Sequence, residues 1–233
     1  MAGLRVTARY LPASHGMDIG GDFYDLIRLG HRRGSRRHRR RPRPQCQRRQ
    51  PHGPGPHRHP RLRRRRGAPG EVLARTNRLL GDLDPDLLTS CPYAHLDITD
   101  HRAHLATAGH CQPLLRHADQ HTTVLALPAG PLLGADPEAH CPGTEIALPS
   151  GAVLALCTDG LIETAGTDPD TNLGELAALL SHPVDSLGTL ANSLLHHARP
   201  SGDRTDDTAL LLTTTASPGT SVTVGRHPRL PVY

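Results

Sequence analysis

Alternating apolar and polar residues recur along the chain, and each such stretch indicates a β-strand with one buried face. In the first stretch the apolar positions are Val6, Ala8 and Tyr10, with polar residues between them. Later apolar runs have the length of strands and are bounded by turn residues such as Pro, Ser and Gly at positions 149–151. The pattern predicts strands over residues 4–11, 88–98, 101–108, 113–116, 122–127, 144–148, 152–157 and 207–214, and a turn leading into one more strand over residues 18–29.

A second pattern, in which apolar residues recur every three or four positions, predicts three helices. The first helix follows Pro69, a residue that suits the first turn of a helix, and it carries Val72, Leu73 and Leu80. The predicted helices cover residues 68–80, 172–180 and 183–197. Many antiparallel strands with a few helices predict an α+β fold rather than a βαβ repeat.

Both patterns stop between residues 31 and 66. The chain holds 27 basic residues, all of them Arg, and sixteen of these fall in this one segment, which holds no Asp or Glu. The rest of the chain has 11 Arg against 22 acidic residues, so an acidic globular protein is interrupted by a basic segment. We divide the chain into residues 1–30 and 67–215, which form one domain, an aberrant segment at residues 31–66, and a flexible tail at residues 216–233.

The cysteines and the N-terminus indicate a cytoplasmic protein. The five Cys have no C-x-x-C spacing and are odd in number, which is typical of buried or incidental thiols in a reducing compartment. The first residues lack the apolar core of a signal peptide, and no apolar run is long enough to span a bilayer. We therefore expect a soluble cytoplasmic protein without a membrane partner.

Acidic residues stand beside apolar strands at three places along the chain. Carboxylates that met at a strand end would repel one another unless a cation lay between them. Mg²⁺ and Mn²⁺ prefer carboxylate and water ligands, and a neighbouring glycine lets the backbone approach a metal or a phosphate closely. The three clusters occupy residues 20–25, 157–160 and 203–207. Taken singly, each cluster is weak evidence, because an Asp-Gly after a strand is usually just a turn and Asp206-Asp207 alone could be a helix cap or a solvated turn.

The order of several short motifs is more specific than any one of them. They are residues 9–13 (Arg-Tyr-Leu-Pro-Ala), 20–25 (Gly-Gly-Asp-Phe-Tyr-Asp), 108–110 (Ala-Gly-His), 130–134 (Gly-Pro-Leu-Leu-Gly), 158–160 (Thr-Asp-Gly) and 206–211 (Asp-Asp-Thr-Ala-Leu-Leu). In this order and spacing they resemble the PPM-type protein serine/threonine phosphatase domain of the SpoIIE/RsbU kind. The resemblance covers about residues 4–214, without residues 31–66.

This resemblance implies an α-β-β-α sandwich with two Mn²⁺ or Mg²⁺ ions at one end of the paired sheets. The ions would assist hydrolysis of a phosphoserine or phosphothreonine by water, with no covalent enzyme intermediate. Carried over residue by residue, the catalytic metal ligands would be Asp22, Asp159 and Asp206. The supporting residues would be Gly21, Asp25, His110, Gly160 and Asp207.

Two expectations stay open at this point. His110 is either a phosphate donor or general acid, or a histidine that hydrogen-bonds a loop beside the site. The resemblance also implies a protein substrate, namely a phosphorylated anti-sigma-factor antagonist in a bacterial partner-switching pathway. Nucleic acid is not the expected partner.

One motif of the family is missing. A strand ending in Gly-Asp-Val-x-Gly-His-Gly, whose Asp would bridge the two metals, and a helix with an Ala-Ala-x-x-Met pattern should follow residue 29. A one-base shift of a GC-rich reading frame can read residues 36–45 as Ala-Val-Ile-Gly-Asp-Val-His-Gly-His-Asn, and residues 46–59 as a sequence containing Ala-Ala-Asn-Leu-Met. We hypothesise two compensating frameshifts, near residues 29–35 and 62–67.

Three functional interpretations follow from this sequence. The first is an active phosphatase, and the second is a degenerate phosphatase that has lost a strand, a helix and one metal ligand. The third is a binding module whose Arg run contacts nucleic acid or an acidic membrane. The Arg run contains no aromatic residue for base stacking, which argues against the third interpretation.

Overall fold

The computed structural model describes residues 3–12, 22, 24–27, 67–163, 167–197 and 206–216. The chain divides into two compact units, one made of Met1–Tyr24 with Gly67–Tyr233 and the other of Asp25–Arg66. The predicted aberrant segment and the predicted tail, apart from Ala216, lie outside the described residues. All regular elements described below belong to the first unit.

The predicted strands and helices are found with small shifts of their ends. They are β1 (Gly3–Leu11), α1 (Pro69–Leu83), β2 (Cys91–Asp97), β3 (Arg102–Ala108), β4 (Leu114–Arg116), β5 (Thr122–Val124), β6 (Thr144–Ala147), β7 (Val153–Cys157), the short 3₁₀ helix η1 (Asp159–Leu161), α2 (Pro169–Leu180), α3 (Leu187–His197) and β8 (Thr208–Ala216). The α+β class is therefore confirmed.

The strand predicted within residues 18–29 is wrong for the part of that segment that the structure describes. Asp22 and residues 24–27 belong to no helix or strand. Leu26 and Ile27 are 46% and 40% exposed, so these apolar side chains find little packing. Since a strand persists only when a neighbour pairs its backbone groups and a core covers one face, an apolar run alone does not secure it.

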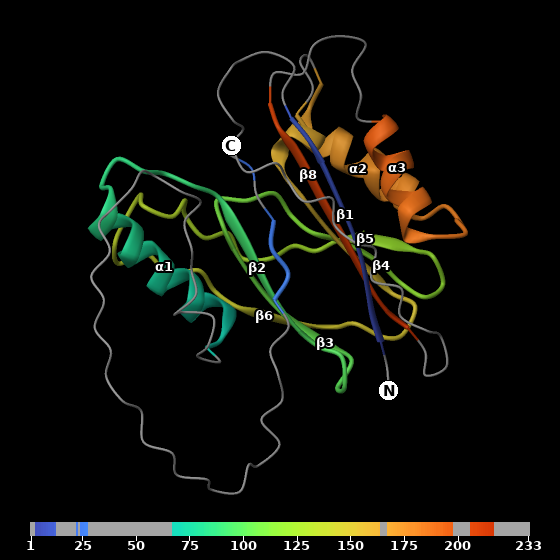
Figure 1. The fold of residues 1–233 in the computed structure, drawn as a ribbon, viewed down its shortest axis with the longest axis horizontal. Coiled ribbons are helices and arrows are strands. Elements are labelled where there is room, and N and C mark those ends of the chain that lie inside the picture. The colour runs from blue at the N-terminus through green and yellow to red at the C-terminus, as the bar shows by residue number, and fades with distance from the viewer. Residues whose placement is uncertain are drawn as a thin grey trace, which may run out of the picture. The chain divides into compact units, whose positions relative to one another are not determined.

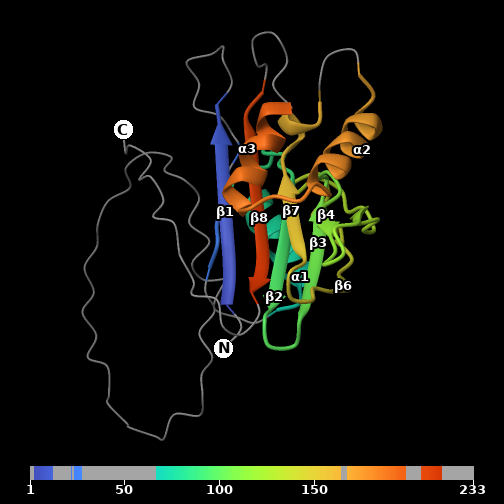
Figure 2. The same cartoon turned by 90° about the vertical axis from the view of Figure 1, so that its right-hand side faces the viewer.

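The strands form two antiparallel sheets, which the reader can follow in the two views of Figures 1 and 2. The larger sheet has the order β1-β8-β7-β4-β5, and the smaller has the order β2-β3-β6. In the larger sheet β8 is central to the register, because it pairs with β1 along its whole length and with β7 from Leu210 to Thr214. Strands that are distant in the sequence thus pair side by side in this sheet.

Alternation along β7 shows how the larger sheet is packed on both faces. Val153, Ala155 and Cys157 belong to the apolar cluster that includes the buried residues of α2 and α3. Leu154 is part of a second cluster, against which Leu156 also packs, and this cluster contains residues of the smaller sheet. One face of the larger sheet therefore packs on helices and the other on the smaller sheet.

The smaller sheet is also packed on both faces. Ala103 and Leu105 of β3 join the cluster between the sheets, whereas Ala106 and Ala108 join a third cluster with Leu73 of α1. Three clusters thus separate four layers: α1, the smaller sheet, the larger sheet, and the α2–α3 pair. In Figure 1, α1 lies on one side of the strands and α2 with α3 on the other.

Local chemistry sets where the helices begin. Pro69 and Pro169 stand at the first turns of α1 and α2, where a missing backbone N–H costs nothing. The helix predicted from residue 183 begins instead at Leu187, because the Ser186 hydroxyl accepts a hydrogen bond from the Thr189 backbone N–H at 3.1 Å and caps it. None of the helices in the described ranges is both long and apolar enough to cross a membrane.

Candidate active site

Antiparallel pairing brings three segments of the chain to one end of the larger sheet. The last residue of β7 pairs with Leu210, and the last residue of β1 pairs with Thr208. The ends of β1 and β7 therefore meet the beginning of β8. As a result Asp159, two residues after β7, and Asp206, two residues before β8, stand at the same end of the sheet.

Reciprocal hydrogen bonds hold the segment after β7 against the start of β8. The Thr158 backbone N–H donates to the Ala209 carbonyl at 3.0 Å, and the Ala209 N–H donates to the Thr158 hydroxyl at 2.8 Å. The Thr208 hydroxyl donates to the Gly160 carbonyl at 3.0 Å. A Cβ atom on Gly160 would overlap the carbonyl oxygen of Asp207, so only glycine permits this approach.

The carboxylates of this junction have defined partners on the described chain. Asp159 accepts a hydrogen bond from the Gly160 N–H at 3.0 Å, and Asp206 accepts one from the Asp207 N–H at 2.8 Å. Asp207 is 3% exposed and accepts a hydrogen bond from the Tyr10 hydroxyl at 2.7 Å. Burial, and then this bond to Asp207, raise the pKa of Tyr10, so the phenol stays a donor.

Asp22 is the least satisfied carboxylate of the group. Its Oδ2 atom is buried and finds no hydrogen-bond partner among the described residues. Burial raises the pKa of Asp22, and the charges of Asp159, Asp206 and Asp207 raise it further, against a lowering by the Thr158 side chain. Four carboxylates therefore lie within electrostatic reach of one another, and a positive charge among them would relieve both the burial and the repulsion.

His110 has hydrogen-bonding partners beside this junction. Its Nδ1 lies 3.0 Å from the Ser90 hydroxyl. Burial lowers the pKa of His110, but Cys111, Asp159 and the hydrogen bond with the Cys157 backbone together outweigh it, and the net shift is upward. The histidine thus has the structural partner that one of its two interpretations requires, while it also lies within electrostatic reach of Asp159.

The structure brings together part of the predicted site. Asp22, Asp159, Asp206 and Asp207 converge, and Gly160 supports them. Gly21 lies outside the described residues, and Asp25 belongs to the second unit.

Two observations bear on whether a metal fits this site. The all-carboxylate donor set and the orphaned oxygen of Asp22 suit Mn²⁺ or Mg²⁺. Within the described part of the chain, however, no three His, Cys, Asp or Glu side chains are grouped closely enough to hold a metal ion. The donor chemistry therefore fits, and the described ligand set is incomplete.

The sequence did not predict the contacts of three residues found here, although two of them, Tyr10 and Thr158, lie within the quoted motifs. Tyr10 was assigned to the buried face of a strand, and its partner Asp207 lies 197 residues away along the chain. Thr158 has a side chain that pairs with a backbone group of the neighbouring strand, and Cys111 follows His110 as an apparently incidental thiol. Their roles arise from strand register, which no local pattern reports.

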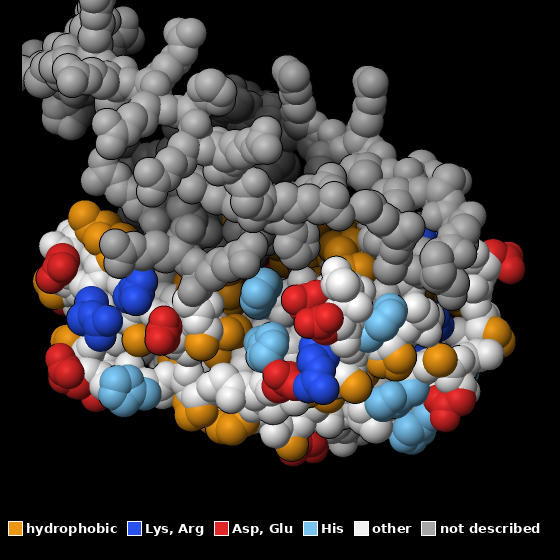
Figure 3. Space-filling model, turned by 90° about the horizontal axis from the view of Figure 1, so that it is seen from below, with side chains coloured by type: hydrophobic (Ala, Val, Ile, Leu, Met, Phe, Trp, Pro, Cys, Tyr) orange, Lys and Arg blue, Asp and Glu red, His pale blue; other side chains and the backbone are white. Residues whose placement is uncertain are grey.

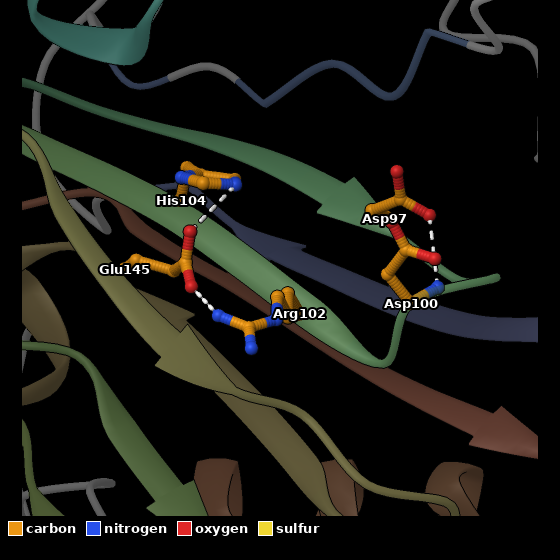
Figure 4. A network of polar contacts seen from close by, with 5 residues as sticks. All are labelled: Asp97, Asp100, Arg102, His104 and Glu145. Carbon is orange, nitrogen blue, oxygen red and sulfur yellow. Dashed lines mark hydrogen bonds and ion pairs between the residues drawn. The ribbon is translucent and has the colours of Figure 1, made fainter.

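A second polar cluster lies on the smaller sheet and is drawn in Figure 4. The register places His95, His104 and Glu145 in one row across β2, β3 and β6. Glu145 forms an ion pair with Arg102 and lies 3.4 Å from His104 Nε2. Figure 3, a view from below the orientation of Figure 1, shows His, Arg and acidic side chains near one another on the surface. Because Arg102 is 58% exposed, the row is a solvated surface rather than a site.

Two sheets between helical layers, with aspartates at one end, define the class of PP2C-type (PPM) phosphatases, which are hydrolases. The family model of Stage II sporulation protein E (SpoIIE) matches residues 59–216, more than half of the sequence. The chain belongs to this family, which confirms the resemblance found in its motifs. No curated protein matches it significantly.

Solved structures show the same fold. The RsbU and RsbW domains of Rv1364c from Mycobacterium tuberculosis are 26% identical, with a TM-score of 0.56, over 65% of this chain and 43% of that one. The SiaA PP2C domain of Pseudomonas aeruginosa is 18% identical, with a TM-score of 0.53, over 63% of this chain and 61% of that one. The catalytic domain of the phosphatase PstP, solved with two manganese ions, is 14% identical, with a TM-score of 0.58, over 93% of this chain and 100% of that one. The chain thus spans less than two thirds of the first two relatives.

Proposed function

We propose that this chain derives from a metal-dependent phosphatase that removes phosphate from phosphoserine or phosphothreonine on a regulatory protein. The observation that carries the proposal is the convergence of Asp22, Asp159, Asp206 and Asp207 at one end of the larger sheet. Four carboxylates in one partly buried place are costly unless cations neutralise them. The PstP relative, which has the same fold, was solved with two manganese ions.

Asp22, Asp159 and Asp206 would hold the ions, as the residue-by-residue resemblance implies. Two divalent cations supply a water of lowered pKa and neutralise charge on the phosphoryl oxygens. Tyr10 holds Asp207 in place through its hydroxyl, and the Thr158–Ala209 hydrogen bonds fix the segment that carries Asp159. Gly160 keeps the two acidic segments in close contact.

His110 would act as a positioning residue beside the site. The Ser90 hydroxyl contacts its Nδ1, and hydrogen bonds with the Cys111 side chain and the Cys157 backbone also hold the ring, so a phosphate or a proton transfer would have to compete with these bonds. The raised pKa of His110 favours the protonated form, which a phosphoryl group would accept as a donor.

The substrate is proposed from the relatives. The similarity to the RsbU and RsbW domains of Rv1364c supports a partner-switching role. A phosphorylated anti-sigma-factor antagonist is the substrate that this role requires.

A specific observation also favours the second interpretation, a degenerate phosphatase. Within the described residues no three side chains can hold a metal, and the motif with the bridging Asp is absent from the sequence. The residues that should carry that motif are 31–66, where the chain is Arg-rich. We therefore propose that the displayed chain lacks most of the activity of its family.

The proposal is tested in a frame-restored chain, in which residues 36–59 are replaced by the shifted reading. We expect Mn²⁺-dependent hydrolysis of a phosphoserine peptide. Asp206→Asn should lower the rate by about 100-fold or more, because loss of a residue that only hydrogen-bonds a metal ligand already lowers activity by about 10–100-fold. Asp159→Asn should do the same.

The matched control is Asp119→Asn. Asp119 caps a surface turn, where it accepts a hydrogen bond from the His121 N–H at 3.1 Å, far from the acidic junction in the sequence. This variant should keep the full rate. Equal rates for Asp119→Asn and Asp206→Asn would remove Asp206 from the site.

A further inference from the structure

We propose that Cys111 and Cys157 form an oxidisable dithiol, which hydrogen peroxide or an organic hydroperoxide converts into an intramolecular disulfide. This modification site goes beyond the proposed function and does not depend on it. It also revises the sequence-based interpretation of these cysteines as incidental thiols.

The fold brings these two residues together from distant parts of the chain. Cys111 follows the end of β3, and Cys157 is the last residue of β7. The Cys111 thiol donates a hydrogen bond to the Cys157 carbonyl at 2.7 Å. Cys111 also packs against the apolar cluster that contains Cys157. A disulfide needs the two Cβ atoms about 3.5–4.5 Å apart with suitable side-chain torsions, and this is the geometry that the proposal requires of the pair.

The surroundings make Cys111 the attacking residue. It is partly exposed, whereas Cys157 is 5% exposed and packs in the cluster with α2 and α3. The Cys157 side chain, as a hydrogen-bond donor to the Cys111 sulfur, and then the neighbouring His110 lower the pKa of Cys111 to about 6, against the effect of burial. A thiolate of this kind, reachable by a small oxidant, is the usual target of peroxide.

The chemistry balances without another reactant. The Cys111 sulfur attacks one peroxide oxygen, the O–O bond breaks, and Cys111 becomes a sulfenic acid while the other oxygen leaves as water or an alcohol. The Cys157 sulfur then attacks the Cys111 sulfur and releases water. Two thiols lose two hydrogens in total, and one peroxide is reduced.

A second pair of cysteines serves as an internal contrast. Cys91 and Cys141 share the apolar cluster beneath α1. Burial and then the neighbouring Cys141 raise the pKa of Cys91 to about 11, and burial raises that of Cys141. Both thiols stay protonated at neutral pH, so this pair should resist peroxide under conditions that oxidise the first pair.

The position of the disulfide gives it a consequence for the molecule. Cys111 adjoins His110, and Cys157 precedes Thr158 and Asp159. The bond would tie the loop after β3 to the strand end that carries Asp159. Forming it also removes the thiol donor that now satisfies the Cys157 carbonyl.

The test uses the full chain with Cys46→Ser, which removes the one cysteine outside the described residues. The reduced protein is treated with hydrogen peroxide at pH 7, alkylated, and cleaved after Arg and Glu. Cleavage places Cys91, Cys111, Cys141 and Cys157 in separate peptides, residues 79–102, 103–116, 139–145 and 146–163. We expect mass spectrometry to find residues 103–116 linked to residues 146–163, while Cys91 and Cys141 are alkylated.

Two further measurements keep the outcome decisive if a substitution disturbs the fold. In Cys157→Ala, the Cys111 sulfenic acid should persist and react with dimedone. In urea, the selectivity for the Cys111–Cys157 link should disappear. The proposal is overturned if peroxide leaves both thiols free in the native chain, if it links Cys91 to Cys141 equally fast, or if urea leaves the pattern unchanged.

Discussion

The two outer faces of the sandwich differ in how completely helices cover them. The larger sheet is covered by α2 and α3, and sixteen buried residues form their common cluster. On the smaller sheet α1 covers one part, where six of the described residues form a buried cluster, and the polar row of His95, His104 and Glu145 occupies another. The aberrant segment, residues 31–66, stands where the family resemblance predicts one more strand and one more helix. Within the described residues, the helical cluster on the smaller sheet is the smaller of the two.

This comparison predicts unequal costs for core truncation. Leu190 in α3 is 0% exposed and Leu73 in α1 is 1% exposed, so both substitutions remove equally buried side chains. Leu→Ala costs about 2–5 kcal/mol, and the cost is lower where the surroundings can collapse into the cavity. Leu190→Ala should fall near the upper end and Leu73→Ala near the lower end. Urea unfolding of both variants measures the difference, and a larger cost for Leu73→Ala would reverse the comparison.

Two glycines of the larger sheet's side, one at the acidic junction and one in α2, allow a comparison of a crowded position with an open one. Gly160→Ala forces a methyl group against the Asp207 carbonyl and should destabilise the fold by about 1–3 kcal/mol. The matched control is Gly174→Ala in α2, where a Cβ atom meets nothing within 4 Å. That substitution should stabilise the helix by about 0.5–1 kcal/mol. Thermal unfolding distinguishes the two, and equal shifts would mean that Gly160 is not under steric constraint.

The smallest predicted effect is a pH dependence from Asp22. A carboxyl whose pKa is raised in the folded state contributes stability that is present below its ordinary pKa of 3.8 and lost as the pH rises through the raised value. In EDTA, the melting temperature should therefore fall with rising pH across this range, and Asp22→Asn should flatten that dependence. In the frame-restored chain with added Mn²⁺, the melting temperature should instead rise with pH across this range. A flat profile for unsubstituted Asp22 in EDTA would contradict the crowding of carboxylates.

Much of the fold was predictable because alternation and helical periodicity report burial directly. The ends of β1, β7 and β8 lie within two residues of their predicted positions. The start of α3 was missed because the Ser186 cap outweighs the helical appearance of residues 183–186. The contact of Tyr10 with Asp207 and the approach of Cys111 to Cys157 depend on which strands pair, and only the three-dimensional register determines that.

The site was predictable only in part, for a related reason. Asp22, Asp159 and Asp206 were identified by motif order, and the structure brings them within electrostatic reach. The family's motif with the bridging Asp is absent from the sequence, and the described residues hold no group of three metal-binding side chains. The proposal of lowered activity rests on these two observations.

The central claim is that residues 31–66 deprive an otherwise recognisable phosphatase of its bridging carboxylate. The most direct measurement is the Mn²⁺-dependent hydrolysis of a phosphoserine peptide by the displayed chain and by the frame-restored chain, at equal concentrations of folded protein. We predict that the restored chain is faster by about 100-fold or more, because a metal ligand and its supporting strand are returned. Equal rates for the two chains would contradict the claim.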